Sequence, residues 1–128
     1  MRKLGKLSAA EMEVMQVIWE ESEAITVAQL VNIFAEEKGW KTSTLSTILS
    51  RLINKGYLRK TMRGKANFYE TLLTLEQYGQ HEAQNLLNGL YAGNVRNFVA
   101  ALAEVENFTQ QDLEELQEWF KDKAGEAN

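Results

Sequence analysis

The chain contains no cysteine and no proline, and it has a single histidine. Without cysteine the protein forms no thiolate metal site, no redox pair and no cysteine nucleophile. The sequence also lacks an apolar run long enough to cross a bilayer. Its first residues include several basic ones, but Glu11 and Glu13 interrupt the segment after them, so the continuous apolar core of a signal peptide is missing. We therefore expect a cytoplasmic protein.

Few residues suggest catalysis. The lone histidine, His81, lies in an acidic segment with helical spacing, where an isolated histidine is far more often solvated than catalytic. Acidic neighbours such as Glu36 and Glu37 fit a helix surface rather than a converging carboxylate pair. The sequence has no phosphate-binding glycine loop, nucleophile elbow or metal-ligand spacing. We therefore expect no enzymatic activity, no metal and no cofactor.

Positive and negative charges are segregated along the chain. Residues 1–73 hold 11 Lys and Arg against 8 Asp and Glu, whereas residues 74–128 hold 3 against 10. No acidic residue occurs from Lys38 to Tyr69. This acid-free stretch favours a surface that faces nucleic-acid phosphates, although a basic surface that contacts only water is the alternative. Its basic residues are Lys38, Lys41, Arg51, Lys55, Arg59, Lys60, Arg63 and Lys65.

Capping signals and apolar spacing predict two helices before residue 40. Ser8 and Glu11 have the spacing of a capping box, which predicts a helix to about position 22. Thr26 and Gln29 repeat that spacing and predict a second helix, which Gly39 ends. The apolar side chains expected to be buried are Met15, Ile18 and Trp19 in the first helix and Val27, Leu30, Val31 and Phe34 in the second.

A third helix and a hairpin come next in the chain. The helix is predicted from Thr42 to just before Gly56, with buried apolar residues at positions 45, 48, 49 and 52. Segments 57–61 and 66–70 resemble strands and flank a glycine-containing turn at 62–65, which predicts a hairpin. Residues 24–26 are expected to be a short extended link. This order predicts a winged helix-turn-helix domain over residues 1–73, in a fold that is mainly α with a small β-hairpin.

The exposed side of the third helix carries small hydroxyl residues. A helix with short side chains can approach the floor of the DNA major groove closely, where hydroxyl groups hydrogen-bond to base edges. Serine and threonine are weak helix formers, so five of them in one short helix favour a function over simple solvation. Near the end of this helix, Arg51 is better placed for a phosphate than for a base.

The hairpin supplies a second predicted contact with DNA. Its basic residues cluster on and near the turn, which suits contact with the DNA backbone or the minor groove. Tyr69 either bonds a phosphate or belongs to the core. The predicted DNA-binding residues are Ser43, Thr44, Ser46, Thr47, Ser50 and Arg51 in the helix, and Arg59, Lys60, Arg63 and Lys65 in the hairpin.

Residues 74–128 form a predicted acidic helical domain. Three short amphipathic helices are expected, at 74–91, at 94–103 and from a cap at Thr109 onward. Such helices need a surface to cover them, and a second copy of the chain is the simplest one; a fold-back onto the first domain in a monomer is the alternative. The predicted dimerisation residues are Leu86, Leu87, Leu90, Phe98, Leu102, Leu113, Leu116 and Phe120.

These features predict a protein that binds specific sequences of duplex DNA as a homodimer. The alternative is a winged helix used only for contact with other proteins, because a fold does not determine a function. The acid-free stretch argues against that alternative.

Two motifs resemble the penicillinase repressor family. The first is the segment 7–15 followed by Ile18-Trp19, and the second is the segment 44–52 followed by the residues KGYL at 55–58. The resemblance continues into the last predicted helix and implies a winged-helix domain, a helical dimerisation domain and repression at palindromic operators. By the same resemblance, Thr44, Thr47 and Arg51 match positions that contact DNA, whereas Ser43 and Ser46 stand where some relatives carry long basic residues.

The resemblance also bears on regulation. The copper-responsive branch of the family ends in a cysteine-rich metal motif, so a chain without cysteine resembles the β-lactam branch instead. That branch is inactivated by proteolysis at an Asn–Phe bond in the dimerisation domain, which implies a regulatory protease as a further partner. Our alignment places Ala101-Leu102 at that position, with Asn97-Phe98 one turn earlier and Asn107-Phe108 just after it.

Overall fold

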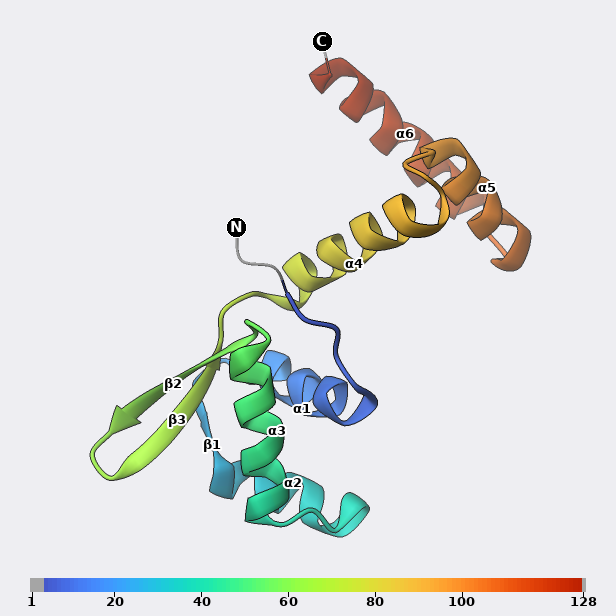
Figure 1. The fold of residues 1–128 in the computed structure, drawn as a ribbon. Helices are drawn as coiled ribbons and strands as arrows, with labels where there is room; N and C mark the ends of the chain where they lie inside the picture. The colour runs from blue at the N-terminus through green and yellow to red at the C-terminus, as the bar shows by residue number, and fades with distance from the viewer. Residues whose placement is uncertain (1–3, 128) are drawn as a thin grey trace. The chain divides into compact units, whose positions relative to one another are not determined.

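The computed structural model describes residues 4–127. They separate into two compact units, of which the first ends at Gly79 and the second begins at Gln80. The described residues are mainly helical with one small antiparallel sheet, as the sequence predicts (Figure 1). The elements are α1 (Ala9–Glu20), β1 (Ile25–Thr26), α2 (Val27–Lys38), α3 (Thr42–Asn54), β2 (Leu58–Arg63), β3 (Ala66–Thr71), α4 (Leu75–Leu90), α5 (Val95–Val105) and α6 (Gln110–Glu126).

Helix ends in the first unit follow the local signals in the sequence. The Ser8 side chain accepts from the Glu11 backbone N–H at 3.2 Å, and the Glu11 carboxylate accepts from the Ser8 N–H at 2.7 Å. Thr26 and Gln29 form the same reciprocal pair at the start of α2. Gly39, with a φ of 64°, ends α2 in the left-handed conformation that glycine adopts without steric cost. Both predicted capping boxes are therefore confirmed.

A single apolar core joins the helices and strands of the first unit. Each helix turns its predicted apolar stripe inward, and α3 buries residues at four positions spaced i, i+3, i+4 and i+7. Three of the predicted core residues, Trp19, Val27 and Val31, are only partly buried, and the Trp19 indole N–H donates to the Leu73 carbonyl oxygen at 3.0 Å. The buried apolar side chains are Val14, Met15, Ile18, Ile25, Leu30, Phe34, Leu45, Ile48, Leu49, Leu52, Tyr57, Leu58 and Tyr69.

The sheet has the strand order β1-β3-β2, and all of its pairs are antiparallel. The hairpin strands extend further than predicted, and Arg63 pairs with Ala66 across a two-residue turn at positions 64–65. Gly64 has a φ of 65°, which a tight hairpin turn requires at its first residue. Residues 25–26, predicted as a link, pair with β3 as a third strand, because this brings the backbone beside the hairpin and satisfies its hydrogen bonds.

One buried ion pair connects the start of α1 with the end of α3. The Glu11 side chain is 2% exposed, and it accepts from the Lys55 ammonium at 2.6 Å. The same ammonium donates to the Lys6 carbonyl oxygen at 2.7 Å. Burial tends to raise the pKa of Glu11, but the bonds from Lys55 and Ser8 outweigh burial and hold this pKa below its ordinary value. Glu11 is therefore ionised at neutral pH.

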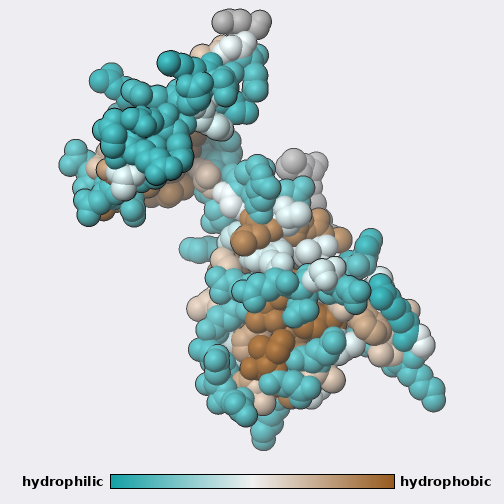
Figure 2. All heavy atoms as spheres, turned by 180° about the vertical axis from the view of Figure 1, so that it is seen from behind, coloured by the Kyte–Doolittle hydropathy of each residue, from teal (hydrophilic) through white to brown (hydrophobic). Residues whose placement is uncertain are grey.

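The second unit, which holds most of α4 together with α5 and α6, has no core of its own among the described residues. No residue of α4, α5 or α6 that the structure describes is buried. Hydrophobic side chains collect along one side of this unit, and hydrophilic ones cover the remainder of the face in view (Figure 2). Across residues 4–127, none of the helices combines the length and the apolar character that a membrane span needs.

Candidate nucleic-acid interface

Helix α3 exposes a polar face because its apolar face is fully used in the core. Leu45, Leu49 and Leu52 have no exposed surface, so packing in the core determines how α3 is rotated about its own axis. On the opposite side Ser43, Thr44, Thr47, Ser50 and Arg51 are exposed, while Ser46 is half-buried. The structure thus brings the six predicted residues of α3 onto one continuous surface and its flank.

The Thr47 hydroxyl is partly engaged within α3. It donates to the Ser43 carbonyl oxygen one turn earlier at 3.0 Å, so it offers a methyl group and lone pairs to an external partner. The N-terminus of α3 has no side-chain capping bond, because Lys41 occupies the N-cap position and its side chain makes none. The first N–H groups of α3 thereby stay available to an acceptor.

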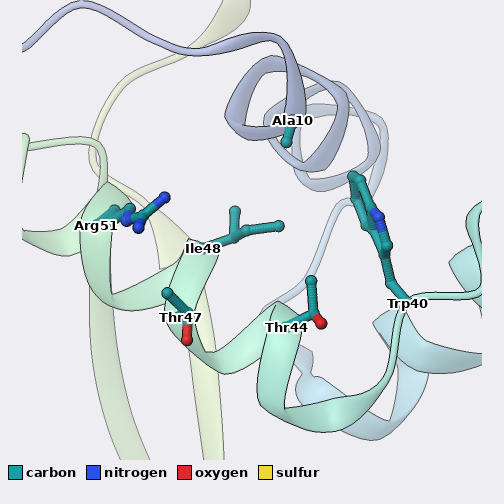
Figure 3. A pocket seen from close by; sticks show the side chains of 6 residues that line it. All are labelled: Ala10, Trp40, Thr44, Thr47, Ile48 and Arg51. Carbon is teal, nitrogen blue, oxygen red and sulfur yellow. The ribbon is translucent and has the colours of Figure 1, made fainter.

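An open hollow lies between the first turn of α1, the link before α3, and α3 itself. Ile48 lies at its centre, and Trp40 and Arg51 stand at opposite ends (Figure 3). Thr44 and Thr47 turn their hydroxyl groups away from Ala10, so the lining is largely apolar (Figure 3). Neither Ala10 nor Trp40 is among the residues predicted from the sequence. An aromatic residue in the short polar link before α3 was the signal available for Trp40.

The hairpin formed by β2 and β3, here called the wing, has two different faces. Lys60 is paired with Tyr69, which is buried, so Tyr69 belongs to the core and Lys60 shares its side of the sheet. On the other side, the Arg63 guanidinium lies 5.1 Å from the centre of the Phe68 ring. This contact holds Arg63 in place near the turn, since a cation over an aromatic face is attracted to it.

Several basic residues of the acid-free stretch are paired in space with acidic residues from outside it. Lys38 lies 3.0 Å from Glu13, Lys55 is bound to Glu11, and the Arg59 Nε donates to Glu70 at 2.8 Å. Arg59 therefore stays a predicted DNA contact, but its guanidinium is already engaged by a carboxylate. Among the basic residues of this stretch, the ion pairs within residues 4–127 do not include Lys41, Arg51, Lys60, Arg63 or Lys65.

The predicted dimerisation residues lie on the open surface of α4, α5 and α6. Leu87 and Phe98 are half-buried, and Phe98 makes an edge-to-face contact with Tyr91. Leu90 is the most exposed of the set, at 75%. The remaining members of the set, all of them exposed, are Leu86, Leu102, Leu113, Leu116 and Phe120.

Comparison with known proteins assigns the chain to a family. The profile described as "Penicillinase repressor" matches residues 7–122. The chain belongs to the penicillinase repressor family. It is 29% identical to the penicillinase repressor of Bacillus licheniformis, over 91% of this chain and 90% of that protein. It is 28% identical to the methicillin resistance regulatory protein MecI of Staphylococcus aureus (strain N315), over 89% and 92% respectively.

Solved structures of the family agree with the winged helix-turn-helix fold of the first unit. The DNA-binding domain of the repressor BlaI has a TM-score of 0.53 and 33% identity, and the match covers 61% of this chain and 94% of that domain. Monomeric Bacillus licheniformis BlaI in complex with the blaP half-operator has a TM-score of 0.51 at the same identity and coverage. The predicted winged helix is therefore confirmed.

The two Asn–Phe bonds of the second unit occupy different local structures. Asn97-Phe98 lies inside α5, where the backbone is helical. Asn107-Phe108 lies in the segment between Glu106, which caps the end of α5, and Thr109, which caps the start of α6. Of these two bonds, only Asn107-Phe108 has a backbone outside a helix.

Proposed function

We propose that this chain is a transcriptional repressor that binds duplex DNA through α3 and the wing. The observation that carries the proposal is the exposed face of α3, where short hydroxyl side chains stand beside Arg51 on a helix whose setting the core determines. Lys60, Arg63 and Lys65 on the wing add positive charge without a carboxylate partner among residues 4–127. A family member whose structure was solved with a half-operator supports the same assignment.

The second unit supports the finer proposal of a homodimer on palindromic operators. Helices α4, α5 and α6 expose apolar side chains and bury none of the described residues, so a second copy of the chain is the economical cover. A two-fold dimer would present two copies of α3 and prefer two half-sites about 10 base pairs apart, or a multiple of that spacing. Selection of bound genomic fragments identifies the operator and tests this spacing directly.

The alternative function is protein–protein contact through the winged helix, without DNA. Binding to duplex at low salt that weakens steeply as salt is added separates the two, because the release of counterions accompanies each phosphate contact. If the protein binds no duplex at low salt, the protein-contact function replaces the repressor.

Replacement of Arg51 by alanine is expected to weaken DNA binding about tenfold while the dimer stays intact, because one exposed cation is lost from the end of α3. The slope of log affinity against log salt should also become shallower by about one. Lys38→Ala is the matched control, since it removes a cation that Glu13 already pairs. Fluorescence anisotropy with duplex DNA measures both variants, and an unchanged affinity for Arg51→Ala counts against the placement of α3 on DNA.

Replacement of Glu70 by glutamine is expected to strengthen DNA binding about two- to threefold, because it removes a negative charge from the wing and releases Arg59. The pair is exposed, so the free energy of unfolding should change by less than about 1 kcal/mol. Glu13→Gln releases Lys38 in the same way but away from the wing, and should change the affinity less. Weaker binding by Glu70→Gln would show that Glu70 positions Arg59 instead of competing with DNA.

Two further elements belong to this proposal. Repression requires a compartment that holds DNA, which agrees with the cytoplasmic location expected from the sequence. A regulatory protease is the proposed further partner, and Asn107-Phe108 is its most suitable target because proteases act on non-helical backbone. Mass spectrometry of fragments from induced cells identifies the cleaved bond, if there is one.

A further inference from the structure

The hollow beside α3 combines an apolar floor with a single charge. Ile48 is 6% exposed, and Trp40 is held against Phe34 with ring centres 5.0 Å apart, so the floor and one wall are fixed by the core. Arg51 is the only charged residue among those that line the hollow. The volume of about 370 Å³ lies in the lower part of the range for ligand sites. Its chemistry therefore suits an anion attached to an apolar body.

The hollow adjoins the exposed face of α3 through which we propose DNA binding. Ser43, Thr47 and Ser50 follow one another at i, i+4 and i+7 and point to the same side of α3. The hollow lies on the flank of this row, toward α1 (Figure 3). A helix in the major groove has a phosphate backbone along each of its flanks, and contacts to that backbone orient the protein without reading sequence.

We propose that this hollow holds one sugar–phosphate unit of the DNA backbone. The apolar sugar lies against Trp40 and Ile48, and the phosphate lies at the Arg51 end, where positive charge has no carboxylate partner within residues 4–127. The small side chain of Ala10 leaves room for this unit on the α1 side of the hollow (Figure 3). The inference rests on the proposed function and adds Trp40 and Ala10 to the interface.

The test compares glutamate and glutamine at position 10. Ala10→Glu places a negative charge at the hollow, whereas Ala10→Gln fills the same space without charge. Ala10 lies in the first turn of α1, where the helix dipole favours an acidic residue, and it is partly buried against the core, so urea unfolding of both variants checks that each is folded. Ala9→Glu is the control for charge alone, since Ala9 is an exposed neighbour in the same turn that does not line the hollow. The probes are a duplex of about 30 base pairs selected from random sequences by the wild-type protein, and an unrelated duplex of equal length.

We expect Ala10→Glu to bind both duplexes about tenfold more weakly than Ala10→Gln, because like charges are brought together, and Ala9→Glu to lose much less. An equal loss on both duplexes identifies a backbone contact rather than a base contact. Replacing single phosphates by neutral methylphosphonates should abolish the difference between glutamate and glutamine at one position in each half-site. Equal binding by Ala10→Glu and Ala10→Gln overturns this inference. Binding of the wild-type protein to duplex would still uphold the proposed function in that case. If the wild-type protein binds neither duplex, the proposed function itself fails.

Discussion

Replacement of Leu116 by glutamate is expected to convert the protein from a dimer to a monomer and to lower its affinity for a duplex with two half-sites about 100-fold. Leu116 is exposed on α6 within the chain, at 39%, so a charge there meets solvent in the monomer but an apolar surface in the proposed dimer. The loss on DNA arises because a monomer no longer gains from binding two linked half-sites. Sedimentation equilibrium and anisotropy titrations measure the two effects.

A matched variant separates dimerisation from simple addition of charge. Gln111→Glu adds the same charge to α6 at an exposed position off the apolar stripe, and should leave the dimer intact. Affinity for a duplex with a single half-site should be similar for wild-type protein and Leu116→Glu, because the first unit is unchanged. If the wild-type protein sediments as a monomer at micromolar concentration, the role proposed for the second unit is wrong.

Replacement of Lys55 by methionine is expected to lower the free energy of unfolding at pH 7 by about 3 kcal/mol. The substitution leaves the Glu11 carboxylate, 2% exposed, without its ammonium partner, and an uncompensated buried charge is strongly destabilising. Glu11→Gln should cost less, about 1 kcal/mol, because a neutral amide remains and Lys55 is partly exposed to water. Urea unfolding followed by circular dichroism measures both variants.

The pH dependence of these variants is set by the direction of the pKa shift. In the wild-type protein the pKa of Glu11 is held below its ordinary value of 4.5, chiefly because the Lys55 bond offsets burial. The stabilisation is therefore complete above pH 4.5 and is lost as the pH falls through the lowered value. In Lys55→Met the bonds from Ser8 are left to oppose burial without the Lys55 bond, so the pKa of Glu11 should be higher than in the wild-type protein and the difference in stability should narrow in acid. A constant difference between pH 7 and pH 3 would contradict this assignment.

Local signals predicted most of the secondary structure correctly. The two capping boxes pair residues three positions apart, Ser8 with Glu11 and Thr26 with Gln29. Such a cap depends only on neighbouring residues at the start of a helix, so its spacing can be recognised in the sequence. The apolar spacing of α3 also predicted which of its sides is exposed, because a helix relates positions three and four apart by geometry alone. The turn of the wing was predicted too long, since only the pairing of Arg63 with Ala66 shows that two residues suffice.

The sequence by itself determined the winged helix-turn-helix order, the polar face of α3 and the unpartnered apolar stripes of the second unit. Only the tertiary structure decided which cations are available to a partner, because Lys55 meets Glu11 across 44 residues and Arg59 meets Glu70 across 11. The hollow between Ala10, Trp40 and Arg51 likewise exists only once α1 packs beside α3. Contacts of this kind depend on how the helices pack against one another, and the spacing of residues along the chain does not predict that packing.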